Sequence, residues 1–459
     1  MQKERSCPFG KRVSMKRERL GSRMGFIMLS AGCAIGCGNV WKFPWMCGQN
    51  GGGSFMLVYF ICLIVLGIPA MVMEFSVGRA AQTSPVRMYR RLEKPGQKWH
   101  LWGAVCLIGN IAIMAFYCVV TGWIIYYFVK FLTGQNASFG FASMIANPVI
   151  NVVFLFVTVA VAFLILSRDI QKGLERITKY MMSALLVLML VLAVHSALLD
   201  GAADGLAFYL TPDFSKINGS VIVGAMNQAF FTLSLGIGAM AIFGSYIGKG
   251  RALMGEAVNV AVLDTFVAFT AGLIIFPACF AFNVSPDSGP NLIFVTLPNI
   301  FNHMAGGRLW GSLFFVFMAF AAFSTVLAVF ENIMSCCMDL TGWSRKKTAA
   351  INIVLMILLS LPCVLGFNVW SGFQPFGPGS NVLDLEDFLV SNLWLPLGSL
   401  VYLLFCTSRY GWGWKNFQNE ANDGGGIKVR DGIRFYVSYI LPLIVLVIFV
   451  LGIRDKFFA

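Results

Sequence analysis

The stretch Gly32-Cys33-Ala34-Ile35-Gly36-Cys37-Gly38-Asn39 decides the fold, because it places three glycines and an asparagine inside the first long apolar run. Each glycine in a helix interior costs about 1 kcal/mol relative to alanine. Backbone that leaves the helix inside a membrane is tolerated only where it lines a protein or water cavity. We therefore interpret the stretch as a broken membrane-spanning helix. Small residues at a close helix crossing are the alternative explanation.

A second interrupted segment, Ser234-Leu235-Gly236-Ile237-Gly238, lies near the start of the other half of the chain. Two interrupted apolar segments in matching positions of two halves indicate the binding site of a transporter. The pair also makes a simple glycine-mediated crossing the weaker explanation of the first stretch.

The composition indicates a helical protein with many membrane spans. Of 459 residues, 58% are hydrophobic and only 12% are charged, with a mean hydropathy of +0.76, whereas soluble chains carry about 25% charged residues. Spans of about 20 residues cross the hydrocarbon layer, and we expect eleven of them: 24–48, 53–80, 101–132, 147–167, 173–199, 219–247, 254–283, 309–338, 348–367, 382–407 and 433–453. Three histidines and the lack of a CxxC pair argue against a metal or redox centre.

The net charge of +13 follows the membrane topology and does not indicate nucleic-acid binding. With the amino terminus inside, most Lys and Arg fall in cytoplasmic segments, as the positive-inside rule requires; the exceptions are Lys42, Lys130, Lys216, Arg308, Arg454 and Lys456. We expect a plasma (inner) membrane protein with a basic cytoplasmic segment (1–23), a transport core (24–407, with halves 24–200 and 219–407), a cytoplasmic loop (408–432) and a last span with a short extracellular carboxyl end (433–459). The Gly- and Asn-rich part of that loop, 417–426, is predicted to be a flexible connector.

Unwound backbone at the first break predicts an ion and substrate site. Carbonyl oxygens at Gly32, Ala34 and Ile35 would hold cations, and the amides of 36–39 at the start of the next half-helix would hold an anion. Asp264 is the sharpest single residue, because a carboxylate within an apolar span is costly and usually marks an ion path.

The hydroxyls of Thr232, Ser324 and Thr325 are weaker signals, since a helical Ser or Thr commonly bonds its own backbone. They gain weight as additional oxygen ligands beside the unwound segments.

These motifs resemble one family. The segments Gly36-Cys37-Gly38-Asn39-Val40-Trp41-Lys42-Phe43-Pro44, Asn50-Gly51-Gly52-Gly53 and Phe230-Phe231-Thr232-Leu233-Ser234-Leu235-Gly236 are similar to those of the neurotransmitter:sodium symporters, in particular the bacterial amino-acid branch. The resemblance covers nearly the whole chain. It implies two inverted five-helix repeats, with the first and sixth helices broken at the membrane midplane and no enzymatic activity.

The resemblance also implies site residues. The substrate would contact Cys33, Ala34, Gly36, Gly38, Ile113, Tyr117, Phe231, Thr232, Ser234, Ile237, Thr325, Val326 and Val329. The first sodium ion would be held by Ala34, Asn39, Thr232, Asp264 and the substrate carboxylate, and the second by Gly32, Ile35, Ala321, Ser324 and Thr325. Tyr117 would bond the substrate carboxylate and Phe231 would close over it. Gly36 stands where amine-transporting relatives carry Asp, which favours an α-amino acid.

Gates and chloride dependence are further implications. The outer charge pair would be Lys42 with Asp387, and the inner pair Arg17 with Asp339, near Tyr246. Chloride-dependent relatives use residues matching Tyr59, Gln228 and Thr232 together with a Ser, which is Ala268 in this chain, while Asp264 replaces a common Asn. Because Asp264 brings its own negative charge, we expect transport without chloride.

The leading hypothesis is sodium-coupled import of hydrophobic or aromatic L-amino acids by alternating access, with two Na⁺ per cycle, in a monomer or weak dimer embedded in lipid. A proton-coupled carrier, a channel or non-transporting amino-acid sensor on the same fold, and an intramembrane enzyme are the alternatives. The last is disfavoured because the sequence lacks HExxH, GxSxG and paired intramembrane aspartates.

Overall fold

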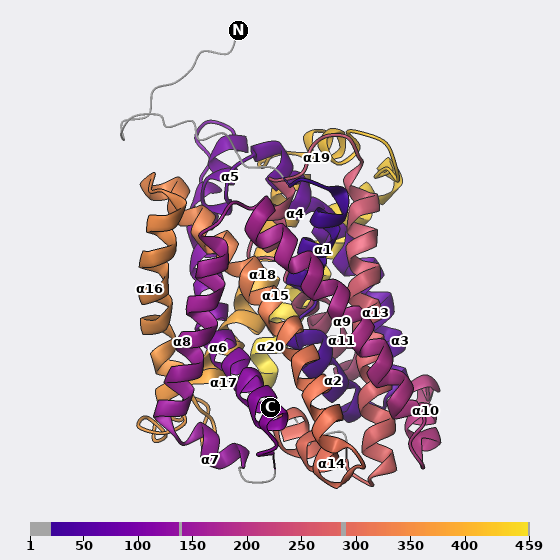
Figure 1. Cartoon of the computed structure of the whole chain (residues 1–459). Helices are drawn as coiled ribbons and strands as arrows, with labels where there is room; N and C mark the ends of the chain where they lie inside the picture. Colours follow the sequence, from indigo (N-terminus) through magenta and orange to yellow (C-terminus); the bar gives the residue numbers. More distant parts are fainter. Residues whose placement is uncertain (1–19, 137–139, 286–290, 458–459) are drawn as a thin grey trace.

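A computed structural model describes residues 20–136, 140–285 and 291–457. In this part of the chain all regular elements are helices, and strand-like pairing is limited to one isolated bridge between Arg251 and Gly425. Long helices lie side by side in a bundle. The short helices α5 (Pro85–Leu92) and α19 (Trp414–Ala421) lie at one end, and α7 (Phe141–Ile145), α10 (Ala202–Leu210) and α14 (Leu297–His303) lie at the other (Figure 1). The predicted all-helical class is confirmed.

Nine helices in the described ranges are long and apolar enough to span a membrane, and one bent pair passes the same test when counted together. The nine are Gly53–Ala81 (α3 Gly53–Cys62, then α4 Ile68–Ala81), α6 His100–Thr133, α8 Pro148–Leu166, Gly173–Ala197 (with α9 Arg176–Ala197), α13 Leu253–Ala281, α15 Gly307–Thr341, α16 Arg345–Leu365, Val382–Thr407 (α17 Val382–Phe388, α18 Leu395–Thr407) and Asp431–Arg454 (with α20 Leu441–Phe457). The bent pair joins α1 (Arg23–Ala34) to the segment Gly38–Gln49, which contains α2 (Phe43–Gln49).

The predicted span 219–247 is made of two helices, α11 (Gly219–Thr232) and α12 (Ala239–Gly244). Neither half is long enough to cross a membrane of about 30 Å alone. The structure therefore gives up to ten spans by length and composition, and the eleventh stays a prediction that depends on counting this interrupted pair. The inverted repeats also stay a prediction.

The first break follows α1 directly. Ile35 adopts an extended conformation (φ −73°, ψ 99°), and a π-helical turn, Gly38–Lys42, then leads into α2. The axes of the two halves differ by 53°. Gly36 is required in this turn, because a Cβ there would lie 2.4 Å from the Tyr117 hydroxyl and 2.5 Å from the Thr325 hydroxyl. The predicted break is confirmed.

The second break occupies the six residues between α11 and α12. Ser234, Gly236 and Gly238 all have positive φ values (51°, 96° and 76°), a conformation that favours glycine. At Gly236 a Cβ would also lie 2.2 Å from the carbonyl oxygen of Leu395 on α18. The chain therefore cannot continue as a regular helix through this segment, as the glycine pattern predicted.

Short irregular turns complete the chain. π-Helical turns occur at Leu63–Gly67, Gln171–Glu175, Leu292–Thr296, Leu389–Trp394 and Tyr436–Ile440, and 3₁₀ turns at Phe214–Lys216 and Asp431–Ile433. The expectation of a flexible connector at 417–426 is wrong for its first part, because α19 occupies Trp414–Ala421. Glu420 of α19 forms an ion pair of 2.7 Å with Arg79 on α4, whose side chain is fully buried. This ion pair holds α19 against the helix bundle.

Candidate functional site

Asp264 of α13 is fully buried and collects hydrogen bonds from three other elements. Its carboxylate accepts from the Asn39 side-chain amide (2.7 Å), the Thr232 hydroxyl (3.1 Å to each oxygen) and the Tyr59 hydroxyl (3.4 Å). Asn39 in turn accepts the amide of Gly36 (3.1 Å). Among the described residues no basic side chain forms an ion pair with Asp264. A buried carboxylate without a basic partner is expected to hold a cation.

The carboxyl end of α1 and the middle of α15 form a second oxygen cluster. The Ser324 hydroxyl lies 3.0 Å from the carbonyl oxygen of Gly32, 2.9 Å from that of Ala321 and 3.4 Å from that of Ile35. The Thr325 hydroxyl lies 3.2 Å from the Gly32 oxygen and 3.3 Å from the Ile35 oxygen.

A hydroxyl carries one proton and can satisfy one of these carbonyls well. The remaining carbonyl oxygens, which α1 leaves free because it ends there, converge with the two hydroxyls in a buried space. Such a set of uncharged oxygens matches the unwound carbonyls that coordinate sodium in transporters.

The predicted substrate residues surround the same two breaks. The Tyr117 hydroxyl accepts the backbone amide of Cys37 (2.9 Å), and the Ser234 hydroxyl lies 3.3 Å from the carbonyl oxygen of Cys33. A Cβ at Gly38 would lie 3.0 Å from the ring of Phe231. The structure thus brings the start of the half-helix after the first break against α6 and α11.

The remaining predicted substrate contacts are mostly apolar side chains. All are buried within the same hydrophobic core: Cys33, Ala34, Ile113, Ile237, Val326 and Val329. Phe231 is half-buried. This composition provides a contact surface for an apolar group and supplies no charge to pair with a charged one.

The two residues of the predicted outer gate lie in contact, and their gating role stays a prediction. The Lys42 ammonium lies 3.6 Å from an oxygen of Asp387 and 3.3 Å from the Ser391 hydroxyl, which itself donates to Asp387 (2.8 Å). The same ammonium lies 3.9 Å from the centre of the Phe231 ring, within the range of a cation–π interaction. Beyond it lies a cavity of about 360 Å³ whose lining includes Asp384, Asp387 and Lys456.

The predicted inner gate is only partly covered by the described residues. Arg17 lies outside them, so its pairing with Asp339 stays a prediction. Asp339 accepts the backbone amide of Ser84 (2.8 Å). Tyr246 was expected near Asp339, and its hydroxyl donates to Glu331 of α15 (2.7 Å).

Two supporting residues were missed by the sequence analysis. Glu74 of α4 is buried, and its two oxygens accept the amides of Gly236 (2.6 Å) and Met240 (3.1 Å), which the second break removes from helical bonding. Asn110 of α6 donates to the carbonyl of Ile237 (2.7 Å). Glu74 carries the same signal as Asp264, an acid in an apolar run, but it lies only five residues before Arg79, near the polar end of its span.

The comparison with known families decides the assignment. The profile described as Sodium:neurotransmitter symporter family matches residues 17–139 and 137–456. The chain belongs to this family. Neurotransmitter:sodium symporters are secondary transporters and not enzymes, so this chain is a sodium-dependent, multi-pass membrane transporter.

Relatives of this symporter agree with the assignment. An uncharacterized sodium-dependent transporter of Bacillus subtilis, YhdH, is 35% identical over 438 residues, covering 93% of this chain and 96% of the relative. A sodium-dependent transporter of Haemophilus influenzae is 31% identical over 455 residues, covering 95% and 98%. The crystal structure of MhsT in complex with L-phenylalanine is similar with a TM-score of 0.86 and 37% identity, covering 95% of this chain and 100% of that one.

Proposed function

We propose that this symporter imports hydrophobic or aromatic L-amino acids together with sodium by alternating access. The observation that carries the proposal is the meeting of the Cys37 amide, the Tyr117 hydroxyl and Gly36 at the start of the half-helix after the first break. That end of the helix dipole attracts a negative group. Since Gly36 supplies no carboxylate of its own, the substrate carboxylate fills this role.

The side chain of the substrate would lie against the apolar residues beside the breaks. Ile113, Ile237, Val326 and Val329 are all fully or nearly fully buried and offer no hydrogen-bonding side chain. A charged or strongly polar substrate side chain would lose its hydration there without compensation. The similar structure of MhsT holds L-phenylalanine, which supports the same class of substrate.

Two sodium ions would travel with each substrate. The first would use the carbonyl of Ala34, the side chains of Asn39, Thr232 and Asp264, and the substrate carboxylate, which couples ion binding to substrate binding directly. The second would use the carbonyls of Gly32, Ile35 and Ala321 with the hydroxyls of Ser324 and Thr325. Each positive charge moved inward across 100 mV contributes about 2.3 kcal/mol, so two ions support strong accumulation.

Closure on the outside would use Lys42, Asp387 and Phe231. The ammonium of Lys42 joins the acid of one helix to the ring that lies beside the substrate region. When that contact opens, the ring is free to move away. We further propose the plasma membrane as location, with the amino terminus inside and the carboxyl end outside, and a monomer or weak dimer as the working unit.

Chloride would not be required. Asp264 already places a carboxylate against Tyr59 and Thr232, two of the residues that correspond to chloride ligands in chloride-dependent relatives. Ala268 offers no hydroxyl at the remaining position. Replacing chloride by gluconate should leave wild-type uptake unchanged, whereas Asp264→Asn combined with Ala268→Ser should make uptake chloride-dependent. Loss of wild-type uptake in gluconate would contradict this.

Uptake of labelled L-phenylalanine into proteoliposomes tests the main proposal. An inward Na⁺ gradient should drive accumulation, and replacing Na⁺ by choline at fixed pH should abolish it. Accumulation driven by a proton gradient in choline would favour a proton-coupled carrier with Asp264 as the titrating group. Binding of amino acids without accumulation would favour a sensor on the same fold. A screen of the twenty amino acids with and without Na⁺ would define the preferred substrate.

A further inference from the structure

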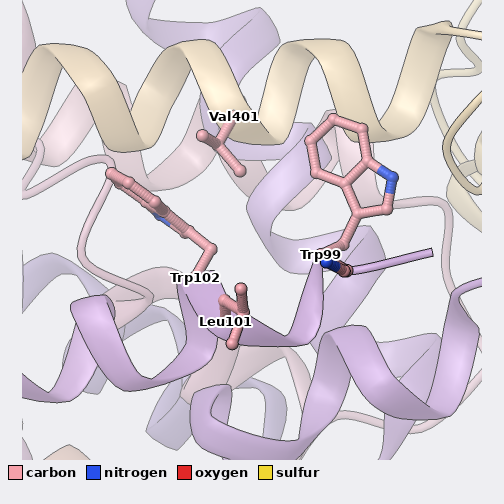
Figure 2. Close-up of a pocket in the computed structure, with 5 residues that line it drawn as sticks. Trp99, Leu101, Trp102 and Val401 are labelled. Carbon is pink, nitrogen blue, oxygen red and sulfur yellow. The ribbon is translucent and has the colours of Figure 1, made fainter.

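A surface cavity lies between the start of α6 and the side of α18. Its lining residues are distant in the sequence from the two broken helices. Its volume is about 310 Å³, and it is lined by Lys98, Trp99, Leu101, Trp102 and Val401. In Figure 2 the rings of Trp99 and Trp102 stand on opposite sides of the space, with Val401 of α18 between them. The cavity is therefore a slot with two indole walls and an apolar back.

The outer faces of both helices beside the slot are apolar and exposed. Leu101 is 60% exposed, Ile108 54% and Leu404 36%. In a membrane protein such side chains face the acyl chains of lipids. Tryptophan is enriched where the hydrocarbon layer meets the head groups, so the two indoles place the slot at that boundary.

The segment before α6, formed by the end of α5 and the following loop, is rich in positive charge, and its Lys98 lines the slot. Arg90, Arg91, Lys94 and Lys98 are all exposed, while the nearby acid Glu93 is engaged with His100 at 2.7 Å. This loop lies on the face of the membrane that carries most of the basic residues. Basic pockets between spanning helices on that face attract anionic lipid head groups.

The two indoles differ in their hydrogen bonding. The Trp99 indole N–H donates to the carbonyl oxygen of Tyr410 (2.8 Å). The Trp102 indole nitrogen is buried and has no hydrogen-bond partner in the described part of the chain. Since the two indole nitrogens are hydrogen-bonded or buried, the rings offer the slot an apolar surface suited to an acyl chain.

We propose that this slot binds one anionic phospholipid, with its phosphate at Lys98 and an acyl chain between Trp99 and Trp102. The lipid would contact α18 at Val401, one turn from Gly398. Gly398 packs so closely on the second break that a Cβ there would lie 1.9 Å from the carbonyl oxygen of Gly236. The lipid site therefore shares a helix with the support of the transport site, but the proposal does not depend on which substrate is carried.

Native mass spectrometry of the purified full chain tests the head-group contact. The protein is incubated with equal amounts of phosphatidylglycerol and phosphatidylcholine, and the retained lipid is measured. Wild type should prefer phosphatidylglycerol, and Lys98→Gln should lower that preference about fivefold, the attraction expected of one basic residue near an anionic surface. The control is Lys346→Gln, an exposed lysine at the start of α16, which should not change it. Equal retention of both lipids by wild type, or equal behaviour of the two variants, overturns the proposal.

Fluorescence quenching by phosphatidylglycerol brominated on its acyl chains tests the placement of the tail. The double variant Trp99→Phe with Trp102→Phe should lose a fraction of the quenching, whereas Trp370→Phe should not. Melting temperatures of all variants identify any that are misfolded, and Trp102→Phe alone provides a milder second variant. Quenching that is equal for brominated phosphatidylcholine would indicate an apolar cleft without head-group selection and would also overturn the proposal.

Discussion

Replacing Gly36 by Ala is the most informative perturbation of the first break. The added Cβ would lie 2.4 Å from the Tyr117 hydroxyl and 2.5 Å from the Thr325 hydroxyl, about 1 Å closer than an ordinary contact. Overpacking of this kind costs about 1–3 kcal/mol. We therefore expect the affinity for L-phenylalanine in Na⁺ to fall about 5- to 150-fold.

The matched control is Gly248→Ala, because a Cβ at Gly248 meets nothing within 4 Å. Its affinity should equal that of wild type in the same equilibrium binding assay. The overpacking should also lower the melting temperature of Gly36→Ala. Adding Tyr117→Phe removes one of the two clashing atoms and should recover part of that loss. It should not recover affinity, because the hydroxyl proposed to contact the substrate carboxylate is lost. Wild-type affinity of Gly36→Ala would refute the close packing at the break.

Three further variants test other parts of the site. Glu74→Gln replaces one acceptor of the Gly236 and Met240 amides by a donor, so loss of a charge-assisted hydrogen bond of about 1.5–3 kcal/mol should lower the initial rate of uptake at least tenfold. Asp204→Asn, at an exposed position, should leave the rate unchanged. Ser324→Ala removes an oxygen of the second cluster and should raise the Na⁺ concentration for half-maximal binding several-fold. Ser312→Ala on the same helix should leave this concentration unchanged. The same Na⁺ concentration for Ser324→Ala and wild type would exclude Ser324 as a ligand. Lys42→Ala should speed release of bound substrate to the outside, measured as exchange, and unchanged exchange would remove its gating role.

The glycines of the two breaks and the acid Asp264 made the centre of the fold predictable. A glycine or a carboxylate inside an apolar span is too costly to be present without a role, and Gly36, Gly236 and Asp264 all occupy the positions that this cost implies. The residues that complete the site were predicted through the family resemblance, since a Ser or Thr in a helix gives no distinctive signal.

Supporting contacts between distant segments were not predictable from the pattern. Glu74 serves backbone amides that are free only because a different helix breaks beside it. Glu420 appeared to belong to a flexible loop, because a Gly- and Asn-rich sequence does not reveal that Arg79 is buried opposite. Tyr246 was placed near Asp339 by analogy, and the pattern gave no sign that its hydroxyl donates to Glu331, about two turns earlier on α15.

Sodium coupling in this symporter requires that the unwound backbone and Asp264 form sites for sodium next to the substrate. Equilibrium binding of L-phenylalanine to the purified transporter, measured in Na⁺ and in choline at constant ionic strength, tests it most directly. Coupling free energies of 1–3 kcal/mol predict an affinity about 5- to 150-fold higher in Na⁺, with most of the difference lost in Asp264→Asn. An affinity that is the same in both salts would contradict the account.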